Sequence, residues 1–269
     1  MEGRMKEYEE EEEVFYSPEH MEATDEENGV ICSNECNNKE QKKKIDHLRA
    51  IVEKQDPACK DVDDFTLGRF LLARDLDVEK ASAMFMKYVK WRRMFVPKGL
   101  ILESEITKQI AHNKVFMQGT DRKGRPIAII FGARHVPCNE NIDQLKRFAV
   151  FVFDKLSSRT PHGEGKFTIL ADLKGYGYSN NDVRGFIPIL SILQNYYPER
   201  LGKLLFIHVP YIFLTAWKII NPFIDKNTKK KIVFVENKRV EATLLEEIYE
   251  SQLPEMYGGK LHLVPIQDA

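Results

Sequence analysis

The chain has 269 residues, of which 43% are hydrophobic and 30% charged, so it can bury a sizeable core. Its formal net charge of -1 gives no electrostatic reason to expect a nucleic-acid partner. The four cysteines lack the paired spacing of a closed zinc site, so we expect free thiols in a reducing cytosol and no metal. No run of about 20 apolar residues exists, so we expect no transmembrane helix.

Residues 1–40 are predicted to be an acidic, disordered tail. Residues 9–13 are an unbroken run of glutamates, which repel one another and bury little apolar surface. The N-terminus also lacks the apolar stretch of a secretory signal, which favours a cytoplasmic protein. The charge changes sign at Lys39 and at residues 42–44. That basic patch indicates the polar face of a starting helix or, alternatively, a contact with an anionic surface.

Residues 41–100 have the pattern of a small helical lobe. Apolar residues recur three and four positions apart from Ile45 until Pro57 ends the pattern. Asp63 and Asp77 each precede another such stretch and can cap it. The apolar stripes of these helices are expected to form a core.

The pattern changes in residues 101–266, where short apolar runs alternate with helical stretches. This alternation predicts a mainly parallel sheet covered by helices. The predicted strands cover residues 125–131, 166–173, 203–209 and 231–235. The predicted helices cover residues 142–156, 182–194, 211–220 and 240–249.

The sequence contains no motif that supports catalysis. It has no phosphate-binding G-x-x-x-x-G-K-[ST] loop, no G-x-S-x-G nucleophile elbow and no H-E-x-x-H helix. Asp172 and His208 lie near predicted strand ends, where α/β active sites form, but no nucleophile accompanies them. We expect Asp172 to cap a turn and His208 to be a satisfied interior imidazole, and we do not expect an enzyme.

The segment 211–221 is apolar on almost every helical face, and only Thr215 and Lys218 interrupt it before its end. Such a helix is either fully buried or faces a non-aqueous medium, and this one is too short to span a bilayer. Lys226 and residues 229–231 follow it, and a basic cluster beside an apolar helix can dock on anionic lipid. The alternative is a buried helix followed by a solvated turn.

Six short motifs follow one another along the chain. They are residues 63–81 (DDFTLGRFLLARDLDVEKA), 121–126 (DRKGRP), 172–175 (DLKG), 194–203 (QNYYPERLGK), 221–225 (NPFID) and 257–260 (YGGK). In type and order they resemble the motifs of the CRAL-TRIO family of lipid-binding proteins. The resemblance covers about residues 45 to 266, and it is greatest to single-domain phosphatidylinositol/phosphatidylcholine transfer proteins of the yeast secretory type.

This resemblance implies an α/β protein in which an all-helical N-terminal lobe packs on an α/β lobe, whose mainly parallel sheet floors a hydrophobic lipid pocket. It implies that residues 210–225 form a gate helix over that pocket, apolar inward to cover acyl chains and apolar outward to enter a membrane. A monomeric cytoplasmic protein would then bind one phospholipid or other hydrophobic lipid without a cofactor and exchange it between membranes during transient contacts. The implied pocket and gate residues are Phe116, Ala128, Phe167, Ile169, Tyr211, Phe213, Leu214, Thr215, Trp217, Lys218, Ile220, Asn221 and Phe223. The implied membrane-docking basic patch is Lys226, Lys229, Lys230 and Lys231.

Several positions depart from the family pattern around the lipid headgroup. Asn221 stands where the yeast-type proteins have a lysine that helps hold the inositol phosphate, and Leu72 replaces an arginine. The polar positions that contact phosphatidylcholine fall at Phe167 and Ile169, and a pocket tyrosine becomes Ala128.

We therefore expect phosphatidylinositol to be held weakly or by relocated cations, with a less polar lipid as the competing cargo. The candidate cations are Lys174, Arg200 and Lys218. The alternative function is a non-transferring adaptor that senses lipid or recruits partners to membranes.

Overall fold

The computed structural model describes residues 35–137, 142–160 and 165–269. The acidic run at residues 9–13 and most of the predicted tail lie outside them. Helix α1 (Glu35–Gln55) begins before residue 41, so the predicted boundary at residue 40 falls within this helix. No helix among the described residues is long and apolar enough to cross a membrane.

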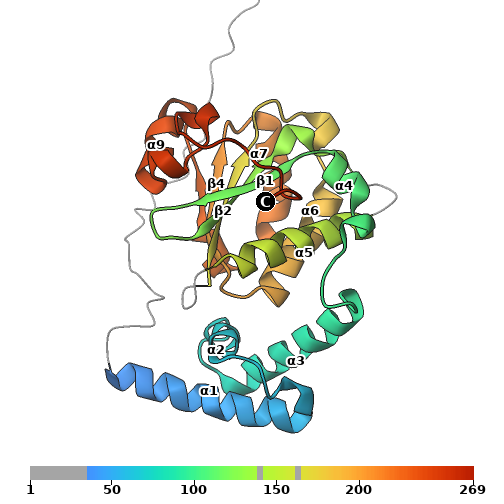
Figure 1. Cartoon of the computed structure of the whole chain (residues 1–269), viewed down its shortest axis with the longest axis vertical. Helices are drawn as coiled ribbons and strands as arrows, with labels where there is room; N and C mark the ends of the chain where they lie inside the picture. Colours follow the sequence, from blue (N-terminus) through green and yellow to red (C-terminus); the bar gives the residue numbers. More distant parts are fainter. Residues whose placement is uncertain (1–34, 138–141, 161–164) are drawn as a thin grey trace, which may run out of the picture. The chain divides into compact units, whose positions relative to one another are not determined.

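The first three long helices share a core of their own (Figure 1). α1 packs against α2 (Asp64–Leu72) and α3 (Val78–Phe95). As predicted, Asp63 and Asp77 cap the last two helices, because each carboxylate accepts a backbone N–H of the first turn. The fully buried large side chains of this core are Leu48, Leu67, Leu71 and Phe85.

A short helix, α4 (Thr107–Ala111), leads into a five-stranded sheet with the order β1-β2-β3-β4-β5. β1 and β2 pair antiparallel as a hairpin, and every later pair is parallel. The strands are β1 (Val115–Thr120), β2 (Pro126–Phe131), β3 (Phe167–Asp172), β4 (Leu201–Ile207) and β5 (Ile232–Phe234). The mainly parallel sheet is as predicted, whereas β1 was not anticipated.

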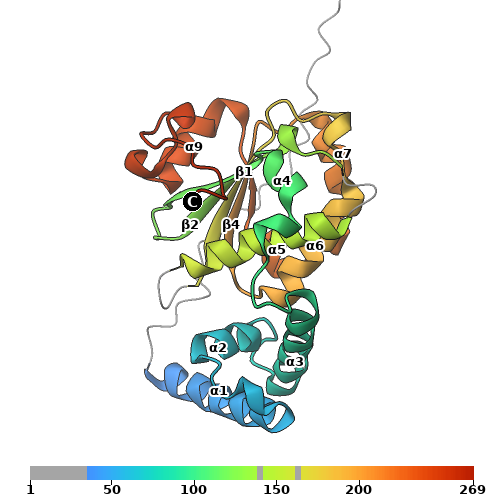
Figure 2. The same cartoon turned by 45° about the vertical axis from the view of Figure 1, so that its right-hand side comes forward.

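Helices cover both faces of this sheet. Figure 2 shows α9 on one side of the sheet and α5 and α6 on the other. The side chains that pack under α5 and α6 include Ala128, Phe167 and Ile169, and those that pack under α9 include Leu170 and Leu205. The helices of this part are α5 (Ile142–Ser158), α6 (Val183–Tyr196), α7 (Tyr211–Ile220), α8 (Lys226–Lys229) and α9 (Val240–Glu247).

Helix α3 is joined to the α/β part by polar and aromatic contacts. Arg92 forms an ion pair of 2.8 Å with Asp154 of α5, and the Tyr197 hydroxyl donates to the same carboxylate at 2.7 Å. Burial and the Asp154 charge raise the pKa of Tyr197, so its hydroxyl stays protonated and donates. The Trp91 ring stacks on Tyr196 with 3.9 Å between the ring centroids. The helical lobe is therefore packed on the α/β lobe, as expected.

Candidate functional site

Helix α7 lies over the end of the sheet and buries an aromatic face against it. Its Phe213 is 4.9 Å from the Phe206 ring of β4, and its Trp217 is 5.7 Å from the same ring. Tyr176 and Phe234 complete the group, at 5.6 Å from Phe213 and 5.1 Å from Trp217. These five rings, called here the aromatic cluster, cover one face of the sheet with apolar surface only.

The apolar strand residues on the side of the sheet under α5, α6 and α7 are not uniformly buried. Ile130, Leu204 and Ile232 are only half-buried, although Phe167 on the same side is fully buried. We call this side of the sheet the α7 face.

Helix α6 borders this face and has the same incomplete packing. It is strongly apolar, yet only Gly185 and Ile192 of its residues are buried. The rest of its apolar side chains are half-buried, namely Phe186, Ile187, Pro188, Ile189, Leu190 and Leu193. A helix this apolar normally buries one full stripe in a core. The arrangement fits a wall that needs an apolar occupant to complete its packing.

The structure brings most of the expected pocket residues to the α7 face. Ala128, Phe167 and Ile169 point to it from the strands, and Phe213 and Ile220 point to it from α7. The remaining gate residues divide between half-buried and exposed positions. Trp217, Leu214 and Asn221 are half-buried, whereas Tyr211, Thr215, Lys218 and Phe223 are exposed.

Phe116 lies apart from the other strand residues of the expected pocket. It is paired with Ile129 in the β1–β2 hairpin and packs with the residues that face α9. Its ring contacts Phe131 at 5.4 Å and lies under the Arg134 guanidinium. Because successive strand residues point to opposite faces, Met117 and not Phe116 belongs to the α7 side.

The outward side of α7 exposes large apolar groups beside lysines. Tyr211, Ile219 and Phe223 are 81, 53 and 55% exposed. Lys226 is exposed on α8, immediately after this surface, as are Lys229 and Lys230. We call these six residues the outer α7 surface. Lys231 differs, because it is half-buried and forms a 3.0 Å ion pair with Glu199, so it does not belong to the exposed basic patch.

The two polar residues noted near strand ends do meet, at the entry to α7. Asp172 ends β3 and is buried; it accepts the Lys174 backbone N–H at 2.9 Å, as expected of a cap. It also accepts the Tyr257 hydroxyl at 2.7 Å, and His208 Nδ1 lies 2.9 Å from it. His208 is thus satisfied as expected, although its side chain is partly exposed rather than interior.

The sequence of this chain also matches a known protein family. A family model described as the CRAL/TRIO domain matches residues 110–259, which is more than half of the chain. The chain belongs to the CRAL/TRIO family.

Curated relatives and a solved structure agree with this membership. The Sec14 cytosolic factor of Schizosaccharomyces pombe is 34% identical over 223 residues, covering 74% of this chain and 75% of the relative. The phosphatidylinositol transfer protein CSR1 of Eremothecium gossypii is 28% identical over 211 residues, covering 74% of this chain and 48% of the relative. The crystal structure of Sfh5 has the same fold, with a TM-score of 0.65 at 20% identity, over 86% of this chain and 89% of that one.

Two of the CRAL/TRIO motifs form one structural unit. In the D-x-x-G-R-P hairpin, the buried Asp121 accepts the Arg125 backbone N–H at 3.0 Å, its guanidinium at 2.6 Å and the Thr168 hydroxyl at 2.6 Å. Gly202 of the 194–203 motif leaves room for Arg125, because an added Cβ would lie 2.5 Å from its guanidinium. These motif residues shape the sheet edge and do not line the α7 face.

Sequence reasoning missed one feature of the CRAL/TRIO motifs, a pair of arginines. An added Cβ at Gly165 would lie 3.1 Å from Arg200 Nη1 and 3.2 Å from Arg69 Nη1, so both guanidinium groups lie beside Gly165. Burial and the Arg200 charge lower the pKa of Arg69 to about 10. Within the described ranges, neither arginine has a carboxylate at ion-pair distance. The R-F-L run that holds Arg69 was the available signal.

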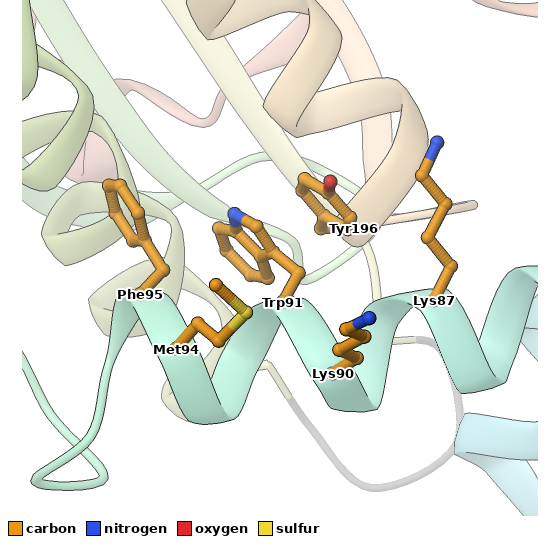
Figure 3. Close-up of a pocket in the computed structure, with 6 residues that line it drawn as sticks. All are labelled: Lys87, Lys90, Trp91, Met94, Phe95 and Tyr196. Atoms are coloured by element: carbon orange, nitrogen blue, oxygen red, sulfur yellow. The ribbon is translucent and has the colours of Figure 1, made fainter.

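A surface hollow of about 420 Å³ is lined by residues of α3 and by Tyr196 of α6. Figure 3 shows it along α3, with the Phe95, Trp91 and Tyr196 rings in a row and the Lys87 side chain beside Tyr196. None of the expected pocket or gate residues lines it. It is a separate feature of the junction between α3 and α6, and we do not assign the lipid site to it.

Proposed function

We propose that this protein binds a single lipid between the sheet and α7 and exchanges it between membranes. The half-buried apolar side chains of α6 and of the strands on the α7 face carry the proposal, because an acyl chain or other apolar group would complete their burial. Membership of the CRAL/TRIO family supports it, and one relative is named as a phosphatidylinositol transfer protein.

The two sides of α7 suit the two stages of exchange. Phe213, Ala216 and Ile220 cover the lipid while the protein is in water. The outer α7 surface offers exposed apolar groups and lysines to a membrane, where an apolar side chain and a basic charge each favour binding. Lipid exchange in this account is a binding equilibrium in which no covalent bond forms or breaks.

The cation that Asn221 lacks is supplied, in this proposal, by Arg200 and Arg69. Arg200 precedes β4, whereas α7 leaves the far end of that strand and runs back toward β5, which is parallel to it. The Asn221 end of α7 therefore returns to the sheet edge at which Arg200 lies, and Gln194 of α6 donates to the Phe223 carbonyl there. Two half-buried guanidinium groups without a carboxylate partner among the described residues favour a lipid phosphate. Lys174 follows β3 at the opposite edge and does not serve this role.

The test is transfer of fluorescent phosphatidylinositol and phosphatidylcholine between vesicles. Ala171→Phe adds a ring beside Phe206 under α7 and is expected to reduce transfer of both lipids at least ten-fold. Val233→Phe, on the other face of the same sheet, is the matched control and should keep most of the activity. With the arginine pair holding the phosphate, the anionic phosphatidylinositol should move faster than phosphatidylcholine.

Three outcomes would count against parts of this account. Equal transfer by wild type and Ala171→Phe, with both folded, would exclude the α7 face as the lipid site. Equal rates for the two lipids would exclude the arginine pair as a selective headgroup site. Lipid bound by wild type but never released to acceptor vesicles would favour the adaptor alternative over exchange.

A further inference from the structure

The chain enters α7 through a backbone conformation that is costly for a side chain. His208 lies between the end of β4 and Pro210, and its φ is +51°. L-residues other than glycine seldom adopt this left-handed region, and they keep it only where their surroundings hold them there. The strain falls on the connection that sets the direction in which α7 leaves the sheet.

One side-chain contact holds His208 in this conformation. Its Nδ1 lies 2.9 Å from a carboxylate oxygen of Asp172, which is only 2% exposed. Asp172 is itself fixed from two further directions, by the Tyr257 hydroxyl and the Lys174 backbone N–H. The imidazole is therefore tied to a rigid point on β3.

Few other polar contacts hold the start of α7 to the sheet. Its N-cap residue is Pro210, which makes no side-chain capping bond, and Tyr211 at its first position is exposed. The apolar contacts of this segment with the sheet come from Val209, Ile212 and Phe213. The contact between His208 and Asp172 is thus the polar tie between the hinge of α7 and the sheet.

We propose that His208 is a positioning residue for lipid exchange: its bond to Asp172 holds the strained turn in which α7 covers the sheet, and release of that bond lets α7 lift. The bond favours the closed position, whereas the strained φ opposes it, because His208 can relax to ordinary backbone angles once the bond is broken. Because the bond and the strain oppose each other, α7 can still open although it covers the lipid most of the time. This inference rests on the proposed exchange function.

The strain and the bond can be separated by substitution. His208→Ala removes the bond but keeps a side chain at positive φ, so α7 should open most readily. His208→Gly removes both the bond and the strain, so its exchange rate should lie below that of His208→Ala and close to that of wild type. Loss of the hydrogen bond should make exchange by His208→Ala about five-fold faster than by wild type, and relief of the strain in His208→Gly should offset most of that roughly five-fold gain. A residue that only fills space would not give this order.

The control has the same strain at a distant position. Asn113, with φ of +50°, precedes β1, and Asn113→Ala should lower stability without changing exchange. Two readouts apply to all variants: phosphatidylinositol transfer between vesicles, and amide hydrogen exchange across α7, which requires no lipid. Trp217 fluorescence can follow the helix in a Trp91→Phe background, since the chain has only two tryptophans.

The expected result is that transfer and α7 amide exchange are fastest in His208→Ala, while His208→Gly stays close to wild type. A folded His208→Ala with wild-type values of both readouts, or a His208→Gly as fast as His208→Ala, would overturn this role of His208. A wild-type protein that transfers no lipid would overturn the proposed function instead, and the amide exchange of α7 would then still decide whether His208 restrains the helix.

Discussion

At the scale of single residues, a buried polar row joins three elements of the α/β part. The Lys114 ammonium lies 3.0 Å from His135 Nδ1, and His135 Nε2 lies 3.0 Å from the Asp182 carboxylate that caps α6. Lysine can only donate, so Nδ1 accepts and the Nε2–H donates, which makes this imidazole neutral. Burial, and then the Lys114 charge, lower the pKa of His135 to about 4 from its ordinary 6.5.

A pH dependence of stability follows from that shift. Between about pH 6.5 and pH 4 the unfolded chain binds a proton at this position and the folded chain does not, so the free energy of unfolding should fall as pH drops through this window. The slope contributed by one histidine is at most about 1.4 kcal/mol per pH unit. Denaturant unfolding of wild type and His135→Gln at several pH values measures it. Identical pH profiles for the two proteins would contradict the neutral buried imidazole.

At the scale of elements, α7 has the bounds predicted for it, residues 211 to 220. Its two proline neighbours and unbroken apolar run made the helix predictable. The division into a buried and an exposed side was not, because a helix that is apolar on all faces has no periodicity to read. Only the packing against Phe206 decides that Phe213 points in and Ile219 points out.

The unanticipated strand β1 has a related explanation. Its second half, Gln118 to Thr120, contains a glycine and two polar residues, which are weak strand signals. β1 is held by its hairpin pairing with β2 and by the chain near Pro265, and the second of these contacts is distant in sequence. Without its register, the face on which Phe116 lies could not be deduced. For the same reason, the meeting of Arg69 and Arg200 was not predicted.

The outer α7 surface gives the prediction at this scale. Ile219→Ser with Phe223→Ser removes exposed apolar groups and should weaken vesicle binding and transfer on the order of ten-fold, while leaving thermal stability nearly unchanged. Phe65→Ser with Leu100→Ser removes similarly exposed groups from the helical part and serves as control. Equal loss in both double variants, or none in the first, would mean that α7 does not meet the membrane. Co-sedimentation with anionic vesicles provides the measurement.

At the scale of the whole molecule, several residues of the family motifs stabilise the fold, whereas the proposed lipid site lies on the α7 face. Asp121, Arg125 and Gly202 fix the sheet edge, and Tyr197 donates to Asp154 of α5, which also pairs with Arg92 of the helical lobe. The α7 face lies between these supports and has apolar walls. The fold was therefore predictable from the motifs, whereas the cargo depends on side chains that meet only in three dimensions.

The most direct test of the central claim is a native mass spectrum of the freshly purified chain. If one lipid completes the packing under α7, the main species should be the protein plus a single lipid mass, released on collisional activation and identified by fragmentation. The same species should form when lipid-free protein is incubated with phosphatidylinositol vesicles. A chain that is purified without lipid and takes up none from vesicles would contradict the account.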